Sequence, residues 1–215
     1  MAAGFGPVPS VANAQQARLP HPVRIPEDAV RIPCCRCLDG SRQPIEINTR
    51  TAAWKVAGPG SSNFQPVAAD GNQAWWPVPP AGWVSPPGHP QSTGDYTYQL
   101  QFYIPPCIIP SQVVISGRFA ADNRARVFLD QQLVASSQGT PDYGFLQGSV
   151  TPFNVTVTTP GLHSLRVVVT NTGGVTGMVM QATIVAICPR DLELSDLSAQ
   201  AAPHQIPDMH PAEPR

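Results

Sequence analysis

The sequence predicts an all-β protein, namely an antiparallel jelly-roll β-sandwich with extended proline-rich tails at both ends. Apolar and polar residues alternate with a period of two in several segments, as strands with one buried face require. Turn residues separate these segments at intervals of about 8–12 residues, and no helical pattern lies between them. These features are typical of two packed antiparallel sheets and not of alternating strands and helices.

The strand expected over 96–104 has the clearest alternation. Tyr96, Tyr98 and Leu100 fall on one face, and Thr97 falls on the other. The residues that follow the next alternating run, Asp122-Asn123, tolerate a tight turn. Further strands are expected over 113–121, 127–129, 153–158 and 165–170, and a last strand, apolar on both faces, is expected over 178–188.

Composition divides the chain into three parts. Residues 1–33 form a proline-rich N-terminal arm without helical or strand periodicity, residues 34–189 form the sandwich domain, and residues 190–215 form a tail that we expect to be mostly disordered. A chain of 215 residues is long enough for one domain with a substantial core.

Charge and hydropathy exclude several partners. The formal net charge is −1 and the arginines are scattered along the sequence, so nucleic acid is not expected as a partner. No segment approaches the roughly 18 apolar residues of a spanning helix, so we expect no membrane insertion. The first 20 residues lack the pattern of a secretory signal. The location therefore stays open between the cytoplasm and an extracellular site reached by a non-classical route.

Three phrases in the central strands carry a family resemblance. They are Gly117–Asn123, Pro152–Val155 and Asn171–Gly177. Their order resembles the galactose-binding-like jelly roll, including the sugar-binding domain of β-galactosidases and β-glucuronidases, and is similar to uncharacterised bacterial β-sandwich modules. The resemblance covers roughly residues 45–188 and implies a fold much more specifically than a ligand.

One turn departs from the pattern of this family. Where the resemblance implies an Asn-Gly hairpin, the sequence has Asp130-Gln131, which lacks the glycine that a type I′ turn favours. Either a longer loop or an aspartate with positive φ is therefore expected at this position.

Asp122 and Asn123 have two interpretations. A carboxylate beside an amide can coordinate calcium or hydrogen-bond to sugar hydroxyls, which makes both residues candidate ligand-binding residues. The simpler interpretation, which we favour, is that both side chains satisfy backbone groups in a tight corner.

Tryptophans form the second candidate binding feature. Trp75, Trp76 and Trp83 precede the main strands in a segment rich in proline and glycine. Loops often carry function when a rigid scaffold positions them, and a flat aromatic face with a polar tip suits stacking on a sugar ring. The alternative is that these rings fill the end of the sandwich. For Trp54, which lies in a plausible early strand, this packing role is the expected one.

Cysteines are concentrated near expected strand ends. The five are Cys34, Cys35, Cys37, Cys107 and Cys188. If the first and last strands are antiparallel neighbours, as the family's sandwich implies, Cys37 and Cys188 lie at the same end, with Cys107 near them. Disulfides, buried free thiols and a thiolate zinc site all stay open, although the spacing matches no common zinc pattern. Disulfides would indicate an oxidising compartment.

Catalytic patterns are absent from the sequence. It contains no Gly-x-Ser-x-Gly elbow, no His-Glu-x-x-His and no phosphate-binding loop followed by a helix, so we do not expect an enzyme. The favoured function is a non-catalytic carbohydrate-binding module with a saccharide or surface glycan as partner and no required cofactor, calcium or zinc being the candidates if one is bound.

Two alternatives to this function stay open. The first is a structural or assembly protein of a bacterial surface, appendage or phage-like particle, which would form homo-oligomers through the N-terminal arm. The second is the accessory domain of an enzyme.

Overall fold

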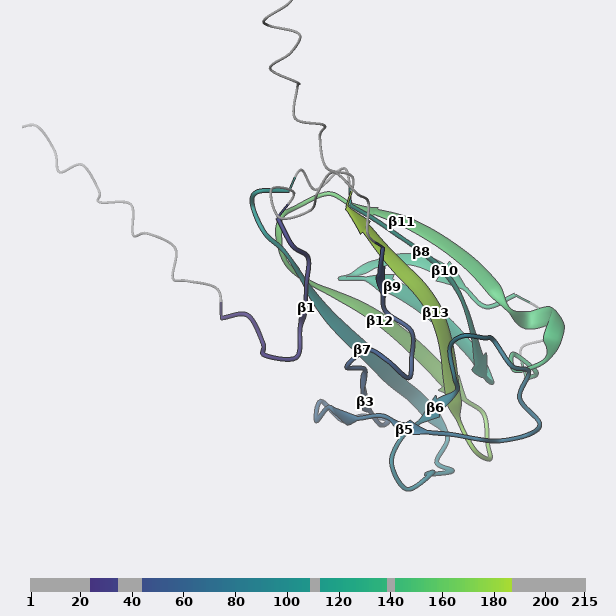
Figure 1. Cartoon of the computed structure of the whole chain (residues 1–215). Coiled ribbons are helices and arrows are strands. Elements are labelled where there is room, and N and C mark those ends of the chain that lie inside the picture. The colour runs from purple at the N-terminus through teal and green to yellow at the C-terminus, as the bar shows by residue number, and fades with distance from the viewer. Residues whose placement is uncertain (1–23, 35–43, 109–112, 139–141, 187–215) are drawn as a thin grey trace, which may run out of the picture.

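The computed structural model describes residues 24–34, 44–108, 113–138 and 142–186. These residues form two β-sheets that lie face to face (Figure 1). Apart from one 3-10 turn, Gln147–Ser149, the elements assigned in these ranges are strands. Within the same ranges, no helix has the length and apolar character needed to cross a membrane. The predicted fold class, an all-β antiparallel sandwich, is confirmed.

The first sheet has seven strands. Their order is β10-β9-β12-β7-β3-β4, and β1 lies beside β7. All pairs in this sheet are antiparallel except β1 with β7, which is parallel. The strands are β1 (Val30–Arg31), β3 (Lys55–Ala57), β4 (Gln65–Pro66), β7 (Gly94–Ile104), β9 (Arg124–Leu129), β10 (Gln132–Ser136) and β12 (Gly161–Asn171).

The second sheet has six strands and is antiparallel throughout its described pairs. Their order is β11-β8-β13-β6-β5, with β2 beside β13. The strands are β2 (Ile45–Glu46), β5 (Ala68–Ala69), β6 (Val84–Ser85), β8 (Val113–Asp122), β11 (Thr151–Val157) and β13 (Gly177–Ala186).

The main core lies between the two sheets and contains the apolar positions that alternate along each long strand. On β7 the side chains of Tyr96, Tyr98 and Leu100 are buried, whereas Thr97 on the other face is only half-buried. The alternation thus places one face of β7 in the core, as predicted. β13 is almost wholly buried because it lies between β8 on one side and β2 and β6 on the other.

A second, smaller core covers the outer face of the six-stranded sheet at one end. It contains Trp75, Val78 and Trp83 from the segment before β6, packed on Ala120 of β8 and Val179 of β13. The buried apolar surface of this small core holds the irregular segment 70–83 against the sandwich, together with hydrogen bonds such as that from Trp75 to Asp122.

The N-terminal boundary of the folded part lies before residue 34. Val30 and Arg31 pair with Phe102 and Tyr103 of β7, and Ile32 belongs to the main core. The end of the expected arm is therefore a strand of the sheet in this structure. The rest of that arm, residues 1–23, and the tail from residue 187 lie outside the described residues.

β2, the first described strand after Cys37, lies antiparallel to β13, the last described strand, as the resemblance implies for the first and last strands of the domain. β1, which precedes Cys34, pairs instead with β7 in the seven-stranded sheet.

The hairpin between β9 and β10 forms without a glycine because Asp130 takes the positive φ, which is one of the two outcomes expected from the sequence. Leu129 pairs with Gln132, so the loop has two residues, and Asp130 takes a φ of 54°. Its carboxylate accepts a hydrogen bond of 2.9 Å from the backbone N–H of Ser164 and lies 2.9 Å from Nδ1 of His163. These contacts hold the aspartate in a backbone conformation that is unfavourable for most residues.

Candidate functional site

Two of the three candidate tryptophans lie inside the small core. Trp75 and Trp83 are only 4% and 5% exposed, and their ring centroids are 4.6 Å apart. The indole N–H of Trp83 donates to the backbone oxygen of Trp76 at 2.8 Å. Their ring faces are covered by protein, so they pack on the outer face of the six-stranded sheet and present no surface to a ligand.

Asp122 is the partner of Trp75. The indole N–H donates a hydrogen bond of 2.9 Å to Oδ2 of Asp122, and this carboxylate is almost fully buried. Burial raises the pKa of the Asp122 carboxyl above its ordinary value of 3.8, while the hydrogen bond from Trp75 acts in the opposite direction. The backbone oxygen of Asp122 accepts a hydrogen bond from the hydroxyl of Thr176 at 2.8 Å.

Asn123 joins its own turn to two other loops at the same corner. Its side-chain N–H donates to the backbone oxygen of Asp142 at 3.1 Å, and its side-chain oxygen accepts from the backbone N–H of Thr172 at 2.8 Å. Its backbone oxygen accepts from the N–H of Gly144 at 2.9 Å. The peptide bond between Asp122 and Asn123 is cis. The side chain of Asn123 therefore satisfies backbone groups, which is the interpretation that the sequence favours.

Asp122 and Asn123 do not fit a calcium site. Calcium takes about six to eight oxygen ligands, but one oxygen of Asp122 faces an indole N–H and the side-chain oxygen of Asn123 faces a backbone N–H. Among the described residues, no three histidine, cysteine, aspartate or glutamate side chains are close enough to share a metal ion.

Three large exposed apolar side chains lie next to this corner, two of them aromatic. Trp76 is 41% exposed, Tyr143 is 53% exposed and Leu146 is 48% exposed. The backbone N–H of Trp76 donates to the backbone oxygen of Phe145 at 2.9 Å, so the segment with Trp76 contacts the segment with Tyr143 and Leu146. Within that second segment, the N–H of Leu146 donates to the backbone oxygen of Tyr143 at 3.2 Å. We call Trp76, Tyr143 and Leu146 the loop-end patch. Exposed apolar side chains indicate an interaction site where they form a contiguous surface, whereas single ones are ordinary.

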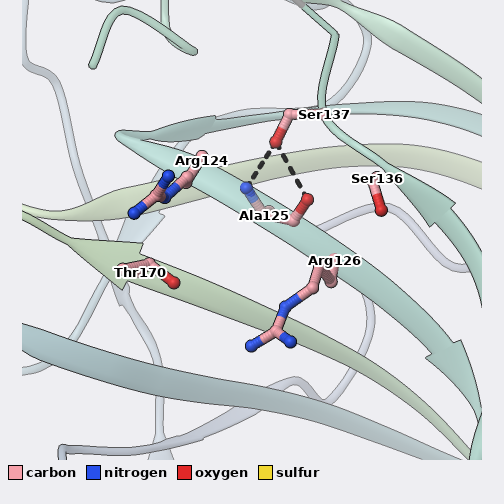
Figure 2. A pocket seen from close by; sticks show the side chains of 6 residues that line it. All are labelled: Arg124, Ala125, Arg126, Ser136, Ser137 and Thr170. Carbon is pink, nitrogen blue, oxygen red and sulfur yellow. Dashed lines mark hydrogen bonds between the residues drawn. The ribbon is translucent and has the colours of Figure 1, made fainter. Parts of the chain in front are cut away.

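A polar pocket opens beside the same corner, on the outer face of the seven-stranded sheet. Its volume is about 360 Å³. Figure 2 shows Arg124 and Arg126 on either side of Ala125 in β9, with Ser136 and Ser137 from the β10 side and Thr170 from β12. The Ser137 hydroxyl bonds both the N–H and the oxygen of Ala125, which fixes the segment after β10 to β9.

The sequence analysis does not predict the pocket, although the alternation of its two arginines with apolar residues is present in the sequence. Arg124 and Arg126 alternate with Ala125 and Val127, so a strand through these residues must place both arginines on one face. The predicted strand began at Val127 and thus excluded both arginines. Tyr143 and Leu146 carried no sequence feature that distinguished them from core residues.

The described cysteines form one disulfide. Cys34, after β1, is bonded to Cys107, after β7, and their Cα atoms are 5.7 Å apart. Cys35, Cys37 and Cys188 lie outside the described residues.

No family model matches the sequence, and no curated protein matches it. Several solved structures are similar in fold. One is the CBM36-1 domain of a multidomain xylanase from the hindgut metagenome of Trinervitermes trinervoides, with a TM-score of 0.39, 12% identity, and coverage of 68% of this chain and 99% of that domain. A second is a CBM36 carbohydrate-binding module in complex with calcium and xylotriose, with a TM-score of 0.37, 12% identity and coverage of 66% and 99%.

A third similar structure is the β-D-glucuronidase of Dictyoglomus thermophilum, with a TM-score of 0.40, 16% identity and coverage of 68% of this chain. The match spans only 28% of the glucuronidase. The two sheets of this protein themselves define it as an antiparallel β-sandwich.

Proposed function

We propose that the protein is a non-catalytic carbohydrate-binding module, and that the loop-end patch stacks on a saccharide through Trp76 and Tyr143. The observation that carries this proposal is the exposure of two aromatic side chains on neighbouring loops of a rigid sandwich, 41% for Trp76 and 53% for Tyr143. Aromatic rings combine an apolar face, which suits the C–H face of a sugar, with a polar atom that can bond a hydroxyl.

The loops that carry these rings are held in place by buried contacts. Trp75, directly before Trp76, is tied to Asp122, and Asp142, directly before Tyr143, is tied to Asn123. Such fixation favours binding because less conformational freedom is lost when the ligand arrives. Asp122 and Asn123 thereby act as positioning residues in this proposal, and Trp76 is the predicted tryptophan that is available for contact.

A non-catalytic role is supported by the carboxylates at this end. Asp122 is buried against Trp75, and Asp142 lies 3.4 Å from the hydroxyl of Thr172. A glycosidase needs two carboxyl groups about 5–10 Å apart across a cleft that admits the sugar, and buried Asp122 does not face such a cleft.

The test is a binding measurement with a panel of soluble polysaccharides, by affinity electrophoresis and then titration calorimetry. Trp76→Ala and Tyr143→Ala should each weaken binding at least about tenfold, since a buried aromatic contact contributes more than about 1.4 kcal/mol, with unchanged thermal unfolding. Leu133→Ala is the matched control, because Leu133 is 52% exposed but lies on β10. Absence of binding to the whole panel, or undiminished binding by Trp76→Ala, would contradict the proposal, as would release of reducing sugar.

A further inference from the structure

The outer face of the seven-stranded sheet carries a row of basic side chains. Arg124 and Arg126 alternate along β9, and strand register places Thr170 opposite Arg124 and Arg166 opposite Phe128. Because every second residue of a strand points to the same side, Arg124, Arg126 and Arg166 all belong to this outer face. We call these three residues and Phe128 the arginine row.

The arginine row is ordered by contacts within itself. The guanidinium carbon of Arg126 lies 5.9 Å from the centre of the Phe128 ring, and that of Arg166 lies 5.7 Å from it. Arg166 also donates twice to the backbone oxygen of Asp130, at 3.1 and 2.6 Å. Cation–π contacts of this kind hold guanidinium groups in place without neutralising their charge.

Two of these arginines are available to a ligand. No hydrogen bond or ion pair joins the exposed guanidinium of Arg124 to any residue in the described ranges. Arg126 lies 3.3 Å from Asp95, but both side chains are 49% exposed. An exposed ion pair of this type contributes little, so a ligand anion can replace Asp95 at low cost.

The pocket around Arg124 and Arg126 has the chemistry of an anion site. Its lining contains no acidic residue, although Asp95 contacts both Arg126 and Thr170 of the lining. It adds three hydroxyl side chains, those of Ser136, Ser137 and Thr170, of which Ser137 already bonds Ala125 and Thr170 already donates to Asp95. Its volume of about 360 Å³ falls at the lower end of the range of small-ligand sites, about 300–1,000 Å³. Guanidinium groups form two parallel hydrogen bonds to a carboxylate or a sulfate, whereas hydroxyl groups suit the hydroxyls of a sugar.

We infer that the saccharide bound by this module is acidic, and that Arg124 and Arg126 bind its carboxylate or sulfate groups in this pocket. The inference rests on the proposed function, because it extends the same saccharide from the loop-end patch across the adjacent corner. Asn123 connects the two surfaces: it precedes Arg124 in the chain, and its side chain binds the segment that carries Tyr143.

The experiment compares polysaccharides that differ in charge alone. Polygalacturonate is compared with its fully methyl-esterified form, and a sulfated galactan with the desulfated polymer, by titration calorimetry at 50 and 300 mM NaCl. We expect an acidic member to bind at least about tenfold more tightly than its neutral partner, as charge-assisted hydrogen bonds allow. The binding should weaken at the higher salt concentration, because exposed charges are screened.

The variants are Arg124→Gln and Arg126→Gln, with Arg31→Gln as the control, because Arg31 is exposed at the other end of the same sheet. Each pocket variant should lose at least about tenfold in affinity for the acidic polymer and keep its affinity for the neutral one, while Arg31→Gln should keep both. Arg124→Lys retains the positive charge but cannot form two parallel hydrogen bonds to one anionic group, so a smaller loss of affinity for the acidic polymer is expected. The thermal midpoint of each variant reports whether it is folded.

The outcomes separate this inference from the proposed function. If acidic and neutral polymers bind equally and Trp76→Ala abolishes both, the arginine inference fails and the module function stands. If double-stranded DNA binds with the same dependence on Arg124 and Arg126 as the acidic polymer, the pocket recognises anions in general and the inference also fails. Carboxylated and sulfated polymers tested side by side identify the anionic group.

Discussion

The indole N–H of Trp75 donates a hydrogen bond to the carboxylate of Asp122, 47 residues further along the chain, with a length of 2.9 Å. Asp122 lies at the end of β8, and its register partner on β13 is Gly177. Trp75 covers this glycine, so the ring passes over β13 to reach β8. Trp75 and Asp122, both candidate ligand-binding residues in the sequence, thus bond to each other on the outer face of the six-stranded sheet.

The raised pKa of Asp122 predicts how stability depends on pH. Because the pKa of this carboxyl is higher in the folded protein than the ordinary value of 3.8, the folded state binds the proton more readily than the unfolded state. Above the folded-state pKa the buried charge therefore lowers the free energy of unfolding. As the pH falls through the folded-state pKa towards 3.8, this penalty is removed and the free energy of unfolding rises.

Asp122→Asn tests this prediction. The amide oxygen can still accept from Trp75, so we expect the variant to be at least as stable as the wild type at pH 7 and the difference to vanish near pH 4. Urea unfolding between pH 3 and 8 measures it. Asp28→Asn is the control. The hydrogen bond with Lys55 lowers the pKa of Asp28, so this carboxylate raises the free energy of unfolding above pH 3.8, and that contribution is lost as the pH falls through the lowered pKa. A less stable Asp122→Asn at pH 7 would contradict the prediction.

The contact between Gly177 and Trp75 predicts a steric effect. A Cβ atom added to Gly177 would lie 2.7 Å from Cζ3 of Trp75 and 2.9 Å from the backbone oxygen of Val84. Gly177→Ala should therefore displace the indole ring, lower the free energy of unfolding by about 1–3 kcal/mol, and weaken saccharide binding through the neighbouring Trp76.

Gly148→Ala is the matched control for this substitution, since no atom lies within 4 Å of a Cβ added there. Its stability and its affinity should stay close to those of the wild type. Equal unfolding free energies for the two alanine variants would show that Trp75 is not held against Gly177.

The strands were predictable because burial of one face imposes a two-residue period that is visible in the sequence. Tyr96, Tyr98 and Leu100 show this on β7, where all three are fully buried. No such period predicts that Trp75 is buried and Trp76 is exposed. The two are adjacent in the chain, and what buries one and exposes the other is the position of Asp122 and Gly177, which pair only when β8 and β13 meet.

The pocket depends on long-range pairing in the same manner. Alternation along β9 places Arg124 and Arg126 on one face, but their neighbours come from β12 and β7. Thr170 and Asp95 are separated by 75 residues, and the hydroxyl of Thr170 donates to the carboxylate of Asp95 at 2.6 Å. No local sequence pattern contains such a juxtaposition, so it became visible only with the register of three strands.

The bond between Cys34 and Cys107 predicts a dependence on reducing agent. It links the segment after β1 to the loop after β7, the two cysteines being 73 positions apart in the sequence, and β1 itself pairs with β7 through only two residues. Reduction, or the variant Cys34→Ser, should lower the free energy of unfolding by about 2–4 kcal/mol. It should also speed amide exchange at Ile32, whose N–H donates to Tyr103.

Peptide mapping by mass spectrometry under non-reducing conditions checks the pairing directly. A peptide pair that joins Cys34 to Cys107 is expected. A Cys34 linked to another cysteine, or carrying a free thiol after air oxidation, would exclude the bond.

At the hairpin we predict that the contacts of the Asp130 carboxylate stabilise the folded protein by more than the positive φ of Asp130 destabilises it. With φ at 54°, an alanine there costs about 1–3 kcal/mol of stability and also loses the acceptor for the N–H of Ser164. Asp130→Gly relieves the strain but still loses the acceptor, so it should fall between Asp130→Ala and the wild type. Asp130→Asn keeps one acceptor oxygen and tolerates positive φ, so its loss should be the smallest. Urea unfolding of the three variants gives the order, and a glycine variant more stable than the wild type would show that relief of strain exceeds the contribution of the contacts with His163 and Ser164.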